Sequence, residues 1–456
     1  MSKKEKQPVD AKHSANSNFG KWGWWIIIYA AILMFISNGA QADGLNLLVS
    51  KFSYVNNWDS NTVLALSTPA GYVALAVGVP LGWLIMKKGA RKVLIGVLIV
   101  GGLSYAAMGN SHTLVAYFIF QCILYTCANC FCMHAANTLI ANWFPKKKGL
   151  ALGWATMGMN ASSALTSVIL AQLFTKFSLA VSLDFFGAAT VAIGIITIFF
   201  IRDTPEEVGC TPDNVPLSKE EIEANNKEHE NYVPKWTFGK LLRDKDTWMV
   251  GMCFGCFMLV TVGIMSQLVG RIMQMGFTQA FAISCVSVCA IIGIAGSYAW
   301  GVLDQKMGTK WATTFFGVFF AAGIVFNVLS SVLLNTNRPA ALACMYISLV
   351  IIGVSIGGTA NFAPSMTTNI FGRREFPLAF TVITTIYNIM KATSYAVLAA
   401  VLAATGSYTA AYIVFIAISL IGSLLAWKID DSPKESRPLK AEEHKKVPAQ
   451  EEAETA

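Results

Sequence analysis

The chain has 456 residues, of which 55% are hydrophobic and only 13% are charged. A soluble globular protein carries about 25% charged residues, so this composition excludes an ordinary water-soluble domain and favours a protein embedded in a membrane. The formal net charge of +8 indicates no nucleic-acid partner, because the basic residues lie in short segments between apolar runs and form no basic domain.

Apolar runs long enough to cross a hydrocarbon core of about 30 Å as α-helices recur along the chain. They predict an all-α membrane protein with twelve transmembrane helices. The expected spans are 24-47, 63-86, 93-109, 113-141, 149-174, 179-201, 248-270, 280-303, 312-334, 340-363, 378-403 and 408-427. Residues 1-22 form a polar tail, and the first span is too long for the apolar part of a secretory signal, so we expect that helix to be retained.

Basic residues in alternate loops set the expected orientation, because Lys and Arg are retained on the cytoplasmic side of short loops. Eleven of them follow spans 2, 4, 8 and 10, namely Lys87, Lys88, Arg91, Lys92, Lys146, Lys147, Lys148, Lys306, Lys310, Arg373 and Arg374. The opposite loops contain Lys51, Lys176, Arg271 and Arg338. Both termini and the long loop should therefore be cytoplasmic, in the inner membrane of the cell.

The loop 202-247 separates two halves of six helices each, 23-201 and 248-428. It contains Ser218 and Glu221 in a capping-box pattern, which predicts a short helix. The tail 429-456 is rich in Lys, Glu and Pro, and we expect it to be disordered. Neither segment has the length of a recognisable catalytic or signalling domain.

The two halves carry traces of an internal duplication. At an offset of 219 residues, a loop motif after the second span recurs after the eighth, pairing Gly82, Lys87, Gly89 and Arg91 with Gly301, Lys306, Gly308 and Lys310. A weaker match at an offset of 228 relates Leu150 to Leu378 and places Ser163 opposite Lys391. In this motif glycine permits a tight turn, and the basic residues hold the loop at the anionic leaflet. We therefore infer two six-helix repeats, each with a gating loop. The alternative is a plain loop that is basic only because it is cytoplasmic.

This loop motif resembles that of the major facilitator superfamily, and the resemblance covers all twelve spans. It implies the fold of that family, in which two six-helix halves alternate access to a central site. The stretches 143-153, 202-209 and 237-242 are similar to the oxalate:formate antiporter and monocarboxylate transporter-like branch. The acidic residue usual in the motif is replaced by Met86, with Gln305 at the matching place and Asp304 one residue earlier, so the family's gating salt bridge does not carry over.

Lys391 is the principal candidate for substrate binding. It lies at the middle of the span 378-403, where a lysine costs about 2.5 to 3.5 kcal/mol. Polar residues at three- and four-residue steps form a stripe that we expect to face a wet cavity, namely Thr384, Tyr387, Asn388, Lys391, Ser394 and Tyr395. We interpret Lys391 as the anchor for a substrate carboxylate, with Tyr387 and Asn388 as donors. The alternative is a lysine paired with Asp43 or snorkelling to an interface.

The related branch places one basic residue on helix 11, which Lys391 matches, and a second on helix 8. The eighth span, 280-303, contains no Lys or Arg. A dicarboxylate held between two cations is therefore disfavoured, and a monocarboxylate is the favoured substrate.

Three further polar positions have more than one interpretation each. Arg271, with Gln267 one turn before it, is either an outer selectivity charge or a snorkelling anchor. Asp43 could carry a coupling proton, lie exposed or pair with Lys391. His134 is a pore-lining donor and proton relay, or a hydrogen-bonded residue between packed helices.

Nine of the ten cysteines lie inside apolar spans, so no disulfide framework is expected. Cys127, Cys130, Cys132 and His134 resemble a set of metal ligands in composition only, because on one helix they spread around the cylinder. We expect neither a metal site nor a cofactor.

The sequence predicts a secondary active transporter for a small organic anion, with a monocarboxylate favoured, working as a proton symporter or an anion exchanger. A proton-driven efflux carrier of amphipathic compounds is disfavoured, because residues 153-162 lack the proline-containing glycine motif of drug antiporters. A solute sensor without transport is the alternative from another class. No nucleotide-binding loop or nucleophile motif indicates an enzyme. The expected partners are the anion, a coupling proton or counter-anion and the lipid bilayer, with the protein as a monomer.

Overall fold

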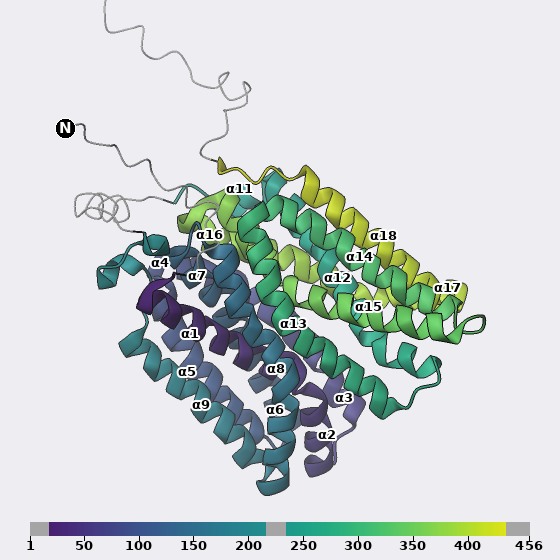
Figure 1. Cartoon of the computed structure of the whole chain (residues 1–456). Coiled ribbons are helices and arrows are strands. Elements are labelled where there is room, and N and C mark those ends of the chain that lie inside the picture. Colours follow the sequence, from purple (N-terminus) through teal and green to yellow (C-terminus); the bar gives the residue numbers. More distant parts are fainter. Residues whose placement is uncertain (1–17, 216–233, 435–456) are drawn as a thin grey trace, which may run out of the picture.

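The computed structural model describes residues 18–215 and 234–434, which form two bundles of helices (Figure 1). The predicted helix at Ser218 to Glu221 and most of the two predicted tails lie outside these residues. No strand occurs in the described ranges, which confirms the all-α prediction.

The N-terminal half makes six crossings, and a π-helix interrupts the first and the fourth. The first crossing consists of α1 (Gly20–Asn38), η2 (Gly39–Asp43) and α2 (Leu45–Asn56), and the second of α3 (Ser60–Ala65) and α4 (Ser67–Lys88). The third is α5 (Ala90–Gly109), and the fourth consists of α6 (Leu114–Asn129), η3 (Cys130–Ala136) and α7 (Asn137–Trp143). The last two are α8 (Lys148–Lys176) and α9 (Leu179–Phe200).

The C-terminal half follows the short linker elements η4 (Pro205–Val208), η5 (Pro212–Asn214) and α11 (Phe238–Arg243). Its helices are α12 (Lys245–Gln274), α13 (Gln279–Met307), α14 (Thr309–Val332), α15 (Arg338–Gly358), α16 (Phe362–Ala392), α17 (Ser394–Thr405) and α18 (Tyr408–Lys428). α16 turns back at Gly372, where φ is +74°. Its first part therefore completes the tenth crossing with α15, and the remainder joins α17 in the eleventh.

Eleven continuous helical stretches in the described ranges are long and apolar enough to cross a membrane. One of them, Arg338–Thr405, has 68 residues and includes the reversal at Gly372, so it supplies two crossings. The prediction of twelve transmembrane helices is thereby confirmed. Most of the buried apolar residues form one large cluster in each half, although Ala141 of the N-terminal half belongs to the C-terminal cluster.

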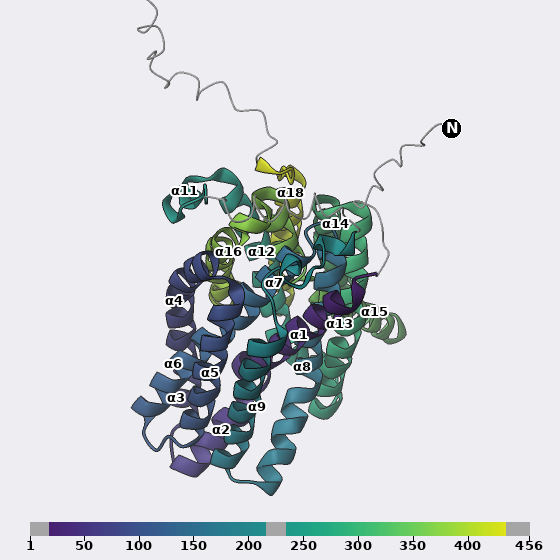
Figure 2. The same ribbon diagram turned by 90° about the vertical axis from the view of Figure 1, so that its left-hand side faces the viewer.

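The linker, both chain ends of the described part and the basic turns lie at one end of the molecule, here called the linker side (Figure 2). Carboxylates of the linker hold these turns. Asp203 accepts a hydrogen bond from the Arg91 backbone N–H (2.7 Å), and Asp213 accepts from the Lys147 backbone N–H (2.7 Å). Burial raises the pKa of Asp203 to about 6, and its bond from Arg91 opposes that shift.

Side-chain caps and glycine turns define the ends of the helices. On the far side, opposite the linker, polar side chains cap the helices that begin there, as Thr113, Ser178 and Thr278 do for α6, α9 and α13. On the linker side, the motif turns pass through Gly89 (φ +86°) and Gly308 (φ +82°). Only glycine adopts this backbone readily, which gives the duplicated glycines of the sequence a structural reason.

The halves touch at the linker side, and their far ends separate (Figure 1). α8 lies against α13 with no side chain between them, since a Cβ on Gly301 would stand 2.6 Å from the Gly149 carbonyl oxygen and 2.8 Å from the Gly153 Cα. α4 also approaches α16 closely, because a Cβ on Gly82 would stand 2.0 Å from the Thr381 hydroxyl. These glycines permit close approach of the two halves on the linker side.

Candidate functional site

Lys391 lies near the end of α16, two residues before Thr393 interrupts the eleventh crossing. Its side chain is exposed. Within the described ranges no hydrogen bond or ion pair involves its ammonium group, and neither Asp43 nor any other carboxylate pairs with it. We expect a mid-span lysine that is both exposed and unpaired in the described residues to face water and not lipid.

The residues of the predicted polar stripe on the eleventh crossing differ in their burial and in the helices that they contact. Thr384 is buried and donates to the Thr381 carbonyl (2.8 Å), while Tyr387 reaches the other half, with its hydroxyl 3.8 Å from the Met133 sulfur. Asn388 is half-buried. Ser394 departs from the prediction, because the interruption at Thr393 turns it toward α12, where it donates to the Leu259 carbonyl (2.8 Å).

The N-terminal half presents a polar cluster at the π-helix η2. The carboxylate of Asp43 accepts one hydrogen bond from the Asn38 amide (2.6 Å) and one from the Ser163 hydroxyl (2.9 Å). The Asp43 backbone carbonyl accepts a third, from Ser167 (2.7 Å). Asp43 is half-buried and its donors are all neutral. π-Helices often occur at functional sites, and this one places a carboxylate against α8.

Hydrogen bonds that join α8 or α16 to the opposite half in the described residues lie on the linker side of Lys391 and of this cluster. Along α8 the last hydrogen bond to the C-terminal half joins the Asn160 amide to the Ser297 hydroxyl (2.8 Å). Ser163, one turn farther toward the far side, is exposed, as is Lys391 one turn beyond Tyr387. The halves therefore present a cation and a carboxylate cluster at the level where they begin to separate.

His134 lies on η3 and is 3% exposed. Its Nδ1 is 3.2 Å from the Thr381 hydroxyl of α16, so it bridges the two halves on the linker side of Lys391. Thr381 was not among the sequence candidates. The polar residue Asn361, which bonds to Thr156 of α8, was also missed, because an uncharged residue in an apolar span gives no signal in one sequence.

Arg271 is turned away from the other half. It is 7% exposed, and its guanidinium donates to Ser331 (2.6 Å) and lies 4.7 Å over the ring of Tyr412. These partners belong to α14 and α18, so Arg271 joins α12 to two helices of its own half. A guanidinium buried between these helices does not fit a snorkelling anchor. It also does not lie in one site with Lys391. Gln267, one turn before it, is half-buried.

We expect Arg271→Gln to act on stability and not on solute binding. The lost cation–π contact and charged hydrogen bonds should cost about 2 kcal/mol, because the site is desolvated. Thermal melting of the purified protein should show a lower midpoint than Arg338→Gln, which removes an exposed arginine on the same side. Unchanged melting with weakened solute uptake would instead support the selectivity role.

The duplicated loop motif has different contacts in the two halves. In the first copy, Met86 is partly buried against the apolar core of the C-terminal half, and Lys87 lies 4.9 Å over the Trp83 ring. In the second copy Lys306 is exposed, while Asp304 is buried beside Gly149 at the start of α8. The carboxylate that Met86 lacks is thus present in the other half, facing a helix N-terminus, where negative charge is favourable.

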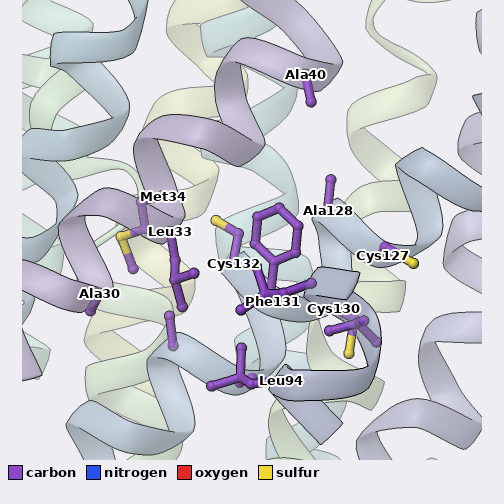
Figure 3. Packing of buried hydrophobic residues seen from close by; sticks show 14 of the residues in the cluster. Ala30, Leu33, Met34, Ala40, Leu94, Cys127, Ala128, Cys130, Phe131 and Cys132 are labelled. Carbon is purple, nitrogen blue, oxygen red and sulfur yellow. The ribbon is translucent and has the colours of Figure 1, made fainter. Parts of the chain in front are cut away.

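The cysteines of the fourth crossing do not converge. Figure 3 shows the side chains of Cys127, Cys130 and Cys132 directed to different sides among the packed apolar residues. All three are free thiols. In residues 18–215 and 234–434 no group of three His, Cys, Asp or Glu side chains is placed to hold a metal ion.

Comparison with known proteins agrees with this architecture. A Glucose-6-phosphate exchanger SLC37A2 of Xenopus laevis is 34% identical over 132 residues, 28% of this chain, and that match spans only 26% of the frog protein. The Uncharacterized MFS-type transporter YhjX of Escherichia coli K12 is 22% identical over 78% of this chain and 82% of its own length. The solved proton:xylose symporter XylE has the same fold, with a TM-score of 0.67 at 12% identity, covering 89% of this chain and 95% of the symporter.

These relatives do not single out the oxalate:formate antiporter branch. They agree on the broader family, and the model of that family matches residues 22–392 and 340–453. The two bundles and the twelve crossings are consistent with this match. The chain belongs to the Major Facilitator Superfamily.

Proposed function

We propose that this transporter moves a small monovalent organic anion, foremost a monocarboxylate, by alternating access between its two halves. The observation that carries the proposal is Lys391, a cation in the middle of a span that is exposed and has no partner in the described residues. An anion that pairs with it would offset the cost of the charge, and its carboxylate would accept the charged hydrogen bond.

The number of cations favours one negative charge on the solute. The basic residues of the other spans lie at span ends, and Arg271 faces α14 and α18. Lys391 therefore neutralises one carboxylate, and a dianion would keep an unpaired charge in a medium of low dielectric constant. This argument also disfavours a sugar phosphate, the solute type named for the frog relative, which matches 28% of this chain.

We further propose that the linker side is cytoplasmic, because it carries the eleven basic loop residues. The site then faces outward in this structure, since contacts between the halves lie on the linker side. Asp43 is the proposed proton acceptor for a symport mode, because its carboxylate is half-buried and its partners are neutral donors. The proposal places one chain in the inner membrane and treats it as a monomer.

Uptake into proteoliposomes tests the proposal. The protein should be offered radiolabelled carboxylates of one and two charges together with glucose-6-phosphate, with and without an imposed pH gradient. We expect saturable uptake of monocarboxylates, and little uptake of the dianions, because one lysine neutralises one charge. A pH gradient should raise accumulation of the solute for a symporter and leave it unchanged for an exchanger.

Three results would contradict the proposal. Preferred uptake of glucose-6-phosphate or a dicarboxylate would require a second cation. No saturable uptake of these anions, together with a broad efflux phenotype on overexpression, would favour the efflux carrier of amphipathic compounds. Binding of a monocarboxylate without uptake or counterflow would favour the solute sensor.

A further inference from the structure

The contact between His134 and Thr381 has a defined direction of hydrogen bonding. The Thr381 hydroxyl donates its one proton to the Pro377 carbonyl (2.6 Å). Its oxygen can therefore only accept from the imidazole, whose Nδ1 is 3.2 Å away. The geometry assigns the proton of the neutral ring to Nδ1 and leaves Nε2 without one.

The other edge of the ring is closely packed. A Cβ on Gly78 would stand 3.2 Å from the His134 Nε2 and 3.7 Å from the Asn129 amide nitrogen. Gly78 and Gly82 lie one turn apart on α4, and Gly82 faces Thr381 itself. The second crossing thus approaches both partners of the hydrogen bond through two residues that have no side chain.

This contact joins the moving parts of the protein. His134 belongs to the π-helix η3 of the N-terminal half, while Thr381 lies ten residues before Lys391 on the same helix, α16. Opening the linker side must separate α4 and η3 from α16, which breaks the bond. The bond therefore exists only while the linker side is closed and Lys391 is open to the far side.

We propose that His134 is a positioning residue of the transport cycle, which holds α16 against the N-terminal half by donating from Nδ1 to Thr381. In this role His134 keeps its Nδ1 proton in the hydrogen bond to Thr381 and does not relay it. The inference does not depend on which solute is transported, so it can fail while the proposed function stands. It replaces the proton relay that the sequence left open for this residue.

Hydrogen–deuterium exchange of the full chain in lipid nanodiscs tests the inference without a solute. Asparagine places an amide nitrogen where Nδ1 lies, whereas glutamine places it near Nε2, so His134→Asn and His134→Gln form a matched pair. A net hydrogen bond contributes about 0.5 to 1.5 kcal/mol, or roughly a 2- to 10-fold change in an opening equilibrium. His134→Gln and Thr381→Val should therefore speed exchange in segments 133–143 and 376–387 by that factor, and His134→Asn should match the parent.

The double variant His134→Gln with Thr381→Val should exchange no faster than either single variant, because both remove one bond. Segment 90–109, in the N-terminal half, is the internal control and should not change. Equal acceleration in His134→Asn and His134→Gln, or additive effects in the double variant, would overturn the inference. If His134→Gln also speeds hydrogen exchange in the control segment, the comparison of Thr381→Val with His134→Asn still tests the proposed hydrogen bond.

Discussion

Replacing Gly301 with leucine should trap the transporter with its linker side open. A Cβ at this position would stand 2.6 Å from the Gly149 carbonyl oxygen and 2.8 Å from the Gly153 Cα, and both atoms are backbone that no rotamer change can move. Overpacking costs about 1 to 3 kcal/mol, which shifts an equilibrium between two states by about 5- to 150-fold. Because most of the buried apolar residues of each half lie in one large cluster, the strain is relieved by separating the halves and not by unfolding them.

The expected result is a loss of uptake of at least about tenfold, together with faster hydrogen exchange in segments 148–160 and 297–307. Gly96→Leu is the matched control, since it adds the same side chain to a helical glycine whose Cβ would meet nothing within 4 Å. Normal uptake and unchanged exchange in Gly301→Leu would mean that this close contact is not the closed gate.

Replacing Lys391 with glutamine should remove most solute binding. A hydrogen bond to a charged group contributes about 1.5 to 3 kcal/mol, so the apparent affinity for a monocarboxylate should fall roughly 10- to 100-fold. Lys391→Arg keeps the charge and should retain part of the uptake, because the guanidinium is larger and differently shaped.

Lys176→Gln is the control for Lys391→Gln, because Lys176 is an exposed lysine at the far end of α8. The Lys176→Gln variant should take up the monocarboxylate as well as the parent protein does. If Lys391→Gln accumulated the monocarboxylate as well as Lys176→Gln does, the anion would be bound elsewhere.

The fold was largely accessible from the sequence, because hydrophobic length and loop charge act over whole segments. Twelve spans follow from these signals, and the two repeats follow from the recurring loop motif, whose glycines are explained by φ angles of +86° and +82° at Gly89 and Gly308. What the sequence did not indicate were the interruptions. The π-helices η2 and η3 and the break at Thr393 depend on packing between helices, and they decide which polar side chains face the site.

Part of the candidate site could also be predicted from the sequence. Lys391 stood out because a charge in mid-span is rare, and the repeat offset placed it opposite Ser163, which proved to bond to Asp43. Arg271 remains a predicted binding residue, and only the structure reveals its contacts with the Ser331 hydroxyl and the Tyr412 ring, which favour a packing role. The sequence could not identify Thr381 as a site residue, because burying a threonine in an apolar span has little free-energy cost. Its role depends on its contact with His134, which only the structure shows.

The central claim is that one lysine selects one negative charge. Isothermal calorimetry of the purified protein in nanodiscs, titrated with butyrate and with succinate, tests it most directly. The account predicts that butyrate binds at least about tenfold more tightly than succinate and that Lys391→Gln weakens butyrate binding roughly 10- to 100-fold. Equal or tighter binding of succinate, or butyrate binding of parental affinity in Lys391→Gln, would contradict it.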